Sequence, residues 1–158
     1  GVEKVTGTAN ADIIIANAAG STIIGGAGND TIIGGAGNDT FVFNSGSGNL
    51  TTIIDVIKDF TTADDSIKTG VAGIAGNFAT ANAAATFAAA TTAADAAFNG
   101  TVKYYFASAI GDASAIGGSA AGADGAVFID WDMDGTADQA ILIVGGVAGA
   151  VVAADFIA

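Results

Sequence analysis

Bulky apolar residues recur every nine positions between residues 7 and 42, and small or polar residues fill the intervals: the four consecutive blocks are GTANADIII, ANAAGSTII, GGAGNDTII and GGAGNDTFV. Glycine reaches backbone angles that other residues avoid, so the first part of each block favours an open turn. The apolar residues that end each block predict a short strand. Each block is therefore predicted to form one coil, made of a turn and a strand.

A single coil buries almost no apolar surface, so the repeat predicts a stack of coils. Side chains alternate along a strand, so the middle strand residue should point into a narrow core and the last should point outward. The predicted core residues are Ile14, Ile23, Ile32 and Phe41. The outward residues are Ile15, Ile24, Ile33 and Val42. We expect the C-terminal half or a neighbouring subunit to cover this apolar stripe; the alternative is a tolerated β-branched surface.

Stacked turns would bring carboxylates and backbone carbonyls together, and these are the oxygen ligands that calcium prefers. If successive turns lie on alternate edges of the roll, the first block faces the third and the second faces the fourth. The first site would use Asp12 and Asp30, with carbonyls near Thr8, Asn10, Gly26 and Gly28. The second would use Asp39, with carbonyls near Asn17, Ala19, Gly35 and Gly37. Ser21 stands where a second carboxylate should be, so we expect this site to be weaker or to borrow an outside ligand.

A flexible glycine-rich linker is the alternative interpretation of this stretch. Such linkers are usually interspersed with serine and lack bulky apolar residues. Here Asp30 and Asp39 occupy the same phase of the period, and a bulky apolar residue follows each of them two positions later. The pattern therefore favours a folded repeat.

The run GGAGNDTIIGGAGNDTFVF, residues 25–43, resembles the repeats-in-toxin (RTX) proteins that Gram-negative bacteria export by type I secretion. The lead-in at residues 2–8 is similar to the segment that often opens such an array. The C-terminal residues Asp155, Phe156, Ile157 and Ala158 resemble the acidic-then-apolar end of an uncleaved export signal. The Ala/Thr/Gly-rich composition is most similar to the C-terminal parts of alphaproteobacterial surface-layer (S-layer) proteins.

These patterns and the resemblance predict a mainly β fold. Residues 1–43 should form a short calcium-binding parallel β-roll, and residues 44–158 a β-rich capping and secretion-signal region with one Ala-rich helix. The predicted elements are a strand over 1–6 that covers the open end of the roll, a strand over 53–60 that leaves it, a helix over 80–98, a strand over 101–106, a hairpin of 126–131 with 140–144, and a last strand and tail over 147–158.

Two further groups of aspartates are candidates for calcium. The run DVIKDFTTADDSI, residues 55–67, resembles the segment that closes RTX rolls. Asp59, Asp64 and Asp65 could contribute to a closing site, or they could be solvated turn residues. Residues 130–138 give D-x-D-x-D-G-x-x-D, which matches the start of an EF-hand loop and makes candidates of Asp130, Asp132 and Asp134. Ile141 takes the place of the last EF-hand ligand and the flanks are strand-like, so we favour a hairpin turn satisfied by local backbone groups.

The composition of the chain argues against several classes of partner and of catalytic chemistry. The net charge of −12, from 16 acidic residues against 4 basic ones, argues against nucleic acid and anionic membranes as partners and favours cations. The chain has no cysteine and no histidine, which excludes disulfides, the usual zinc sites and Ser-His or Cys-His catalysis. We therefore expect no enzyme activity. The apolar, uncharged stretch 139–154 is shorter than the ~20 residues that a membrane span needs.

Two functions agree with these features. Clustered carboxylates repel one another and ordered glycines are costly, so the roll should fold only with Ca²⁺. Such a chain, expected to be part of a longer protein, would stay unfolded in calcium-poor cytosol, pass through the type I secretion apparatus and fold outside, as a secreted, extracellular or cell-surface module. The alternative is calcium-dependent surface assembly, as an S-layer lattice or adhesin, through self-association or contact with cell-surface polysaccharide.

Overall fold

The computed structural model describes residues 3–17, 19–44, 54–81, 84–113, 117–119, 124–145 and 150–158, and its strands form two sheets. The five-stranded sheet has the order β1-β3-β5-β7-β12, and the seven-stranded sheet has the order β2-β4-β6-β11-β10-β9-β8. The strands are β1 (Glu3–Thr6), β2 (Ile13–Ile15), β3 (Ser21–Ile24), β4 (Thr31–Ile33), β5 (Thr40–Val42), β6 (Ile54–Ile57), β7 (Ser66–Lys68), β8 (Phe78–Ala81), β9 (Tyr104–Ala107), β10 (Gly125–Ile129), β11 (Gln139–Ile143) and β12 (Phe156–Ile157). The predicted mainly β class is confirmed.

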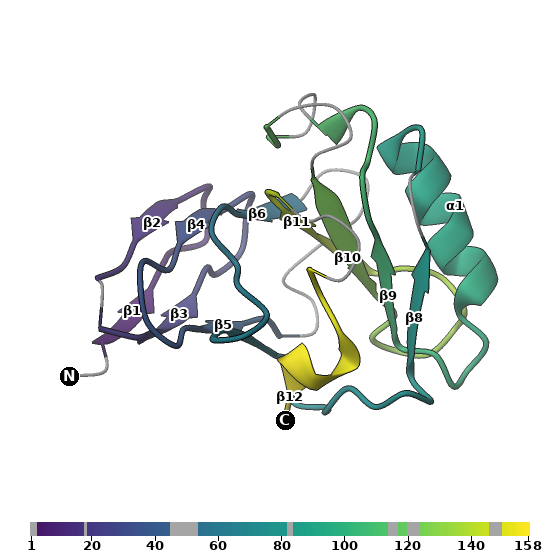
Figure 1. Ribbon diagram of the computed structural model, residues 1–158, viewed down its shortest axis with the longest axis horizontal. Coiled ribbons are helices and arrows are strands. Elements are labelled where there is room, and N and C mark those ends of the chain that lie inside the picture. Colours follow the sequence, from purple (N-terminus) through teal and green to yellow (C-terminus); the bar gives the residue numbers. More distant parts are fainter. Residues whose placement is uncertain are drawn as a thin grey trace.

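Successive strands of the N-terminal part alternate between the two sheets, which makes this part a parallel roll (Figure 1). β2 pairs in parallel with β4, so that Ile14 lies opposite Ile32. β3 pairs in parallel with β5, so that Ile23 lies opposite Phe41. The predicted facing of the first block with the third, and of the second with the fourth, is confirmed. The predicted first strand is also present, because β1 pairs in parallel with β3.

The core of the roll is formed by the middle residue of each coil, as the alternation along the strands predicts. Ile14, Ile23, Ile32 and Phe41 are all buried. The outward stripe is covered only in part: Ile15 is 70% exposed, whereas Ile24, Ile33 and Val42 are half-buried. Ile13, which comes just before the core residue of the same strand, is 79% exposed. The described part of the chain therefore does not cover these two outer isoleucines of the first coil.

The strand that we expected to leave the roll remains in it. β6 pairs in parallel with β4, and β7 pairs in parallel with β5. The reason is visible in the sequence, because Asp55-Val56-Ile57 and Asp65-Ser66-Ile67 repeat the Asp-x-apolar end of the nonapeptides. Both sheets of the roll thus continue past residue 43. The division of the chain into domains at that residue stays a prediction.

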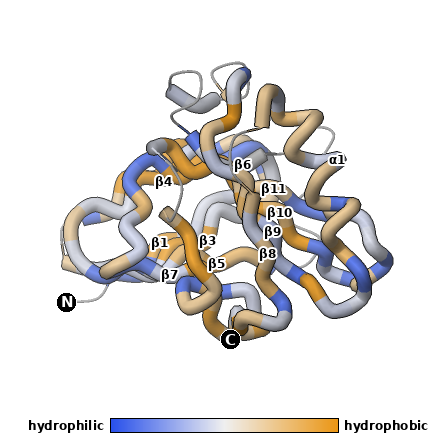
Figure 2. Tube along the Cα trace, turned by 45° about the vertical axis from the view of Figure 1, so that its right-hand side comes forward, coloured by the Kyte–Doolittle hydropathy of each residue, from blue (hydrophilic) through white to orange (hydrophobic). Residues whose placement is uncertain are grey.

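The C-terminal region continues the larger sheet. β11 pairs in parallel with β6 and antiparallel with β10, and β10 pairs antiparallel with β9. The predicted hairpin is therefore confirmed. One hydrophobic cluster runs from Ile32 and Phe41 of the roll to Phe106 and Val127 of the C-terminal region. Figure 2 shows hydrophobic segments along the strands of both sheets, whereas hydrophilic segments lie mainly in turns and outer loops.

The helix α1 (Phe87–Ala97) packs against β9 and β10, in the part of the larger sheet that lies beyond the roll (Figure 1). Its buried face includes Ala90 and Ala94, which pack in a second hydrophobic cluster with Phe128. The helix begins later than predicted, because β8 takes the first part of the alanine-rich stretch and pairs in parallel with β9. Thr86 caps the helix, and its hydroxyl accepts a hydrogen bond from the Ala89 amide at 3.1 Å.

The C-terminal segment docks against the last coil of the roll. A short 3-10 helix, Ala153–Asp155, leads into β12, which pairs in parallel with β7. The Phe156 ring stacks on Tyr104, with 4.2 Å between the ring centroids. The Asp155 carboxylate accepts a hydrogen bond from the Thr62 hydroxyl at 2.9 Å. Asp155 and Phe156, both in the predicted export signal, are thus buried parts of the fold.

Candidate calcium sites at the edges of the roll

Aspartates of successive coils form a column along each edge of the roll. On the first edge, the Asp12 amide donates to Asp30 Oδ1 at 2.9 Å, and the Asp30 amide donates to Asp55 Oδ1 at 3.0 Å. On the second edge, the Ser21 amide donates to Asp39 Oδ1 at 2.7 Å, and the Asp39 amide donates to Asp65 Oδ1 at 2.9 Å. One oxygen of each of these four carboxylates is thereby used to join neighbouring coils.

Within the described part of the chain, the other oxygen of the central aspartate in each column has no partner. Asp30 Oδ2 and Asp39 Oδ2 are buried and accept no hydrogen bond from any residue that the structure describes, and the same holds for Ser21 Oγ. A buried, unpaired carboxylate oxygen is costly, and proteins normally pair such a charge or give it to a metal. Carboxylate and hydroxyl oxygens are hard donors of the kind that calcium prefers. The residues present therefore fit a calcium ion on each edge.

The electrostatics of the columns favour a cation as well. Burial raises the pKa of Asp30, and the Asp12 carboxylate raises it further. Burial also raises the pKa of Asp39, with smaller contributions from Asp65 and Asp59. Asp55 is affected most, because burial and the nearby Asp30 bring its pKa to about 6. A bound cation reverses these effects, because it stabilises the ionised form of each neighbouring carboxylate.

The glycines of the turns let facing turns come together closely. Gly26 and Gly28 have φ values of 112° and 111°, which favour glycine. A Cβ at Gly26 would strike the Thr8 carbonyl oxygen, and a Cβ at Gly28 would lie 2.6 Å from the Asn10 carbonyl carbon. On the second edge, a Cβ at Gly35 would lie 2.7 Å from the Asn17 carbonyl oxygen. Gly37, with φ 111°, likewise lies against the turn that contains Ala19. The residues predicted to supply carbonyls are thus brought together in facing pairs.

A family model described as the RTX calcium-binding nonapeptide repeat, in four copies, matches residues 6–41 and 15–50. The RTX nonapeptide repeat is therefore present over residues 6–50. RTX nonapeptide repeats bind Ca²⁺, which identifies calcium as the cation that these turns accept. A search of curated proteins found no match to the chain. Within the described residues, no helix has the length and apolar character needed to cross a membrane.

At two residues of the RTX columns, the structure shows contacts that the sequence did not predict. Asp12 is in its predicted place, but its Oδ2 accepts hydrogen bonds from the Thr8 amide at 2.6 Å and the Thr8 hydroxyl at 2.9 Å. Asp55 was not predicted, although it continues the first column. Its spacing of 25 residues from Asp30 breaks the RTX period, and the signal that could have found it is the Asp-x-apolar triplet.

The aspartates after the RTX repeats mainly cap the backbone of the roll. Asp59 accepts hydrogen bonds from the amides of Gly34 and Gly35, at 2.9 and 2.8 Å. Asp65 joins the second column and also accepts from the Thr61 amide at 2.8 Å. Asp64 is exposed. Asp65 therefore lies where the second RTX site could borrow a carboxylate, whereas the contacts of Asp59 agree with a turn residue.

The hairpin between β10 and β11 holds the last candidate group. Carboxylate oxygens of Asp130, Asp132 and Asp138 lie within 4.8 Å of one another, so the structure replaces the predicted Asp134 with Asp138. Asp134 turns away to accept from the Thr136 amide at 2.8 Å, because this contact closes its own local turn. The cause of the difference is the turn geometry, which the EF-hand spacing does not describe.

The contacts of this hairpin agree with a turn stabilised by its own backbone. Asp130 accepts from the Met133 amide at 2.7 Å and the Gly135 amide at 3.0 Å, and Asp138 accepts from the Trp131 amide at 2.6 Å. A lysine already brings positive charge to this loop. Lys103 Nζ donates to the carbonyl oxygens of Asp130 and Trp131, each at 3.0 Å. Burial lowers the pKa of Lys103, and Asp130 opposes that effect.

Proposed function

We propose that this chain is a calcium-dependent folding and export module at the C-terminus of a type I secreted RTX exoprotein. The observation that carries the proposal is the pair of buried oxygens Asp30 Oδ2 and Asp39 Oδ2, one on each edge of the roll, which accept no hydrogen bond from the residues that the structure describes. In the absence of a cation these oxygens oppose folding, and in its presence they become ligands. Folding of the roll is then conditional on calcium.

The energetics support a switch of this kind. Each glycine ordered in the turns costs roughly 0.5–1 kcal/mol relative to alanine. The carboxylates of a column repel one another. The apolar core of the roll is small and offsets little of this cost. An ion that binds only the folded chain stabilises it by about 2.7 kcal/mol at a hundredfold excess over its Kd. The chain therefore stays unfolded where calcium is scarce and folds where it is abundant.

The docking of the C-terminal residues links this switch to export. Phe156 is 1% exposed and Asp155 is 4% exposed when the chain is folded, and β12 pairs with β7, the last strand of the roll. An export apparatus can read these residues only while the roll is unfolded. Folding outside the cell then buries the signal and prevents return through a narrow channel.

A calcium titration followed by far-ultraviolet circular dichroism tests the proposal, with magnesium as the control cation. We expect strand signal to appear with calcium, to stay absent with magnesium at the same concentration, and to be lost in excess chelator. A spectrum that is equally folded in excess chelator would refute calcium-dependent folding. Secretion of a reporter fused to residues 1–158, compared with one that lacks residues 155–158, tests the export step.

The exposed first coil favours a second candidate function, calcium-dependent surface assembly. β2 is an edge strand of the larger sheet, and its Ile13 and Ile15 are 79% and 70% exposed. An apolar edge strand of this kind can pair with another chain. Sedimentation velocity with and without millimolar calcium, on the natural chain and on Ile13→Thr/Ile15→Thr, tests it. A natural chain that stays monomeric at both calcium levels excludes assembly through this edge.

A further inference from the structure

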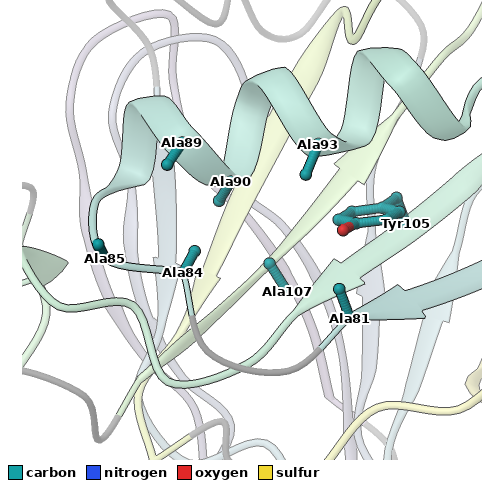
Figure 3. Close-up of a pocket in the computed structure, with 8 residues that line it drawn as sticks. All are labelled: Ala81, Ala84, Ala85, Ala89, Ala90, Ala93, Tyr105 and Ala107. Carbon is teal, nitrogen blue, oxygen red and sulfur yellow. The ribbon is translucent and has the colours of Figure 1, made fainter.

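A pocket lies between α1 and the neighbouring strands β8 and β9, far from the calcium columns (Figure 1, Figure 3). Its volume is about 230 Å³. Seven alanines and one tyrosine line it: Ala81, Ala84, Ala85, Ala89, Ala90, Ala93, Tyr105 and Ala107. None of these lining residues carries a charge, and the tyrosine hydroxyl is their single polar side-chain group.

The space exists because small side chains lie between large ones on the inner side of the helix. At the start of α1, Phe87 packs on Phe128 of the sheet, with 5.4 Å between the ring centroids. Just after its end, Phe98 is buried in the same hydrophobic cluster. Between these two rings the helix presents Ala90 and Ala93 toward the pocket. The pocket opens to solvent at the exposed lining residues Ala85, Ala89 and Ala93, so a ligand can enter it.

Tyr105 supplies the hydrogen-bonding group of the pocket. The residue is 4% exposed, and its hydroxyl has no hydrogen-bond partner among the described residues. Figure 3 shows the hydroxyl directed into the space bounded by Ala90, Ala93 and Ala107. The hydroxyl oxygen is not among the fully buried unpaired atoms of the described residues, so it faces the open space of the pocket and can bond to a ligand there. The neighbouring Tyr104, by contrast, has two hydrogen-bond partners, since its hydroxyl lies 2.6 Å from the Thr69 hydroxyl and 2.6 Å from the Val71 carbonyl oxygen.

We propose that this pocket binds a compact, mostly apolar molecule with one hydrogen-bonding group, of the size of a small phenol. The alanine walls provide apolar burial, and the Tyr105 hydroxyl provides one directional contact. An apolar cavity of about 150 Å³ is enough to hold benzene, so 230 Å³ accommodates a ring with a short substituent. A charged ligand would be left without a counter-charge on these walls, which excludes that class.

Two probes of the same shape test the proposal on the calcium-loaded chain. The first is 4-methylphenol, and the second is p-xylene, in which a methyl group replaces the hydroxyl. We expect saturable binding of both by NMR titration, with 4-methylphenol about fivefold tighter, which is the effect of one net hydrogen bond. Tyr105→Phe should remove this preference and leave the binding of p-xylene unchanged.

Filling the pocket supplies the second arm of the test. Ala93→Leu and Ala89→Leu each change an exposed lining residue of α1, and both should abolish binding of both probes. Ala96→Leu, at an exposed helix position outside the lining, is the matched control and should bind as the natural chain does. The proposal fails if neither probe saturates, if binding survives in both filled variants, or if Tyr105→Phe keeps the preference for the phenol.

Discussion

The Asp39 amide donates a hydrogen bond to Asp65 Oδ1 at 2.9 Å, although 26 residues separate the two in sequence. Asp39 is the sixth residue of the last nonapeptide, and Asp65 lies in the segment that follows the repeats. Their contact extends the carboxylate column of the second edge by one coil. The segment after the repeats therefore completes the roll, and it also carries the sheet into the C-terminal region.

Removal of one central carboxylate should weaken calcium binding on one edge only. Asp30→Asn and Asp39→Asn each replace a buried anionic oxygen with a neutral group, and ligand charge is a main determinant of calcium affinity. We expect each variant to need roughly tenfold more calcium to fold, as followed by circular dichroism. Asp64→Asn, at an exposed position, is the control and should behave as the natural chain. Equal midpoints for all three variants would contradict the assignment of the columns.

A carboxylate at position 21 should strengthen the second site. Ser21 is 2% exposed, and its hydroxyl oxygen is without a partner in the described structure. Ser21→Asp supplies the charge that the repeat lacks there, so the calcium affinity of this edge should rise by roughly tenfold. The same change adds repulsion with Asp39 in the absence of the ion, so the calcium-free chain should be less folded.

Isothermal titration calorimetry separates these two effects when the Ser21→Asp chain is compared with Ser21→Ala. The alanine variant keeps the backbone amide that donates to Asp39, and it removes only the hydroxyl oxygen. Calcium binding by the aspartate variant that is no tighter than that of the natural chain would show that position 21 does not face the ion.

The nine-residue period was sufficient to predict the coils, their core residues and the facing of alternate turns. Each of these features depends on local chemistry that recurs at fixed spacing, namely glycine in the turn and an apolar residue at the strand centre. The place of Asp55 could not be read from the same period, because the connection to the next coil is longer than one repeat. After a longer connection, the pairing of strands depends on tertiary contacts, and the repeat spacing does not predict these.

The alanine-rich stretch shows a different limit of sequence analysis. Helix propensity favours alanine throughout residues 80–98, yet Ala81 belongs to β8 and lies opposite Ala107 of β9. Pairing with a neighbouring strand overrides a weak local preference there. In the hairpin, likewise, the EF-hand spacing selects Asp134, whereas the fold brings Asp138 to Asp130 and Asp132. The sequence motif contains all four of these aspartates, and only the folded turn shows which three of them converge.

Mild acid should partly substitute for calcium in folding the chain. Burial, with the charge of Asp30, raises the pKa of Asp55 from 3.8 to about 6 in the folded state. The folded chain then binds this proton more tightly than the unfolded chain, so stability rises as the pH falls from about 6 toward 4 and is lost as the pH rises through that range. The difference of about 2 units corresponds to about 3 kcal/mol for this one group.

Circular dichroism in excess chelator at pH 5 and pH 7.5 measures this effect. We expect more folded chain at the lower pH, and Asp55→Asn should raise the folded fraction at pH 7.5 because it removes the buried charge. With calcium present the trend should reverse, since protons compete with the ion for carboxylates. A calcium-free chain that unfolds further between pH 7.5 and pH 5 would contradict the prediction.

Loss of the Phe156 ring should destabilise the folded chain as a whole. The side chain is 1% exposed, stacks on Tyr104 and lies in the cluster that runs from the roll to the C-terminal region. Phe156→Ala should cost about 3–5 kcal/mol, the usual range for a buried phenylalanine. Urea unfolding in saturating calcium measures it, and Val152→Ala, at a site 41% exposed, is the control. An effect no larger than that of the control would mean that the C-terminal segment is not part of the core.

A methyl group on a turn glycine should separate backbone strain from the close approach of facing turns. Gly26 and Gly70 both have positive φ, at 112° and 79°. A Cβ at Gly26 would meet the Thr8 carbonyl oxygen, whereas a Cβ at Gly70 would find nothing within 4 Å. Gly70→Ala should therefore cost only the strain of a left-handed residue, about 1–2 kcal/mol. Gly26→Ala should cost more, and it should also weaken calcium binding, because the carbonyls of the two turns must move apart. Equal losses of stability in the two variants, measured by urea unfolding in saturating calcium, would show that the turns can separate without penalty and that their close stacking is not required for the site.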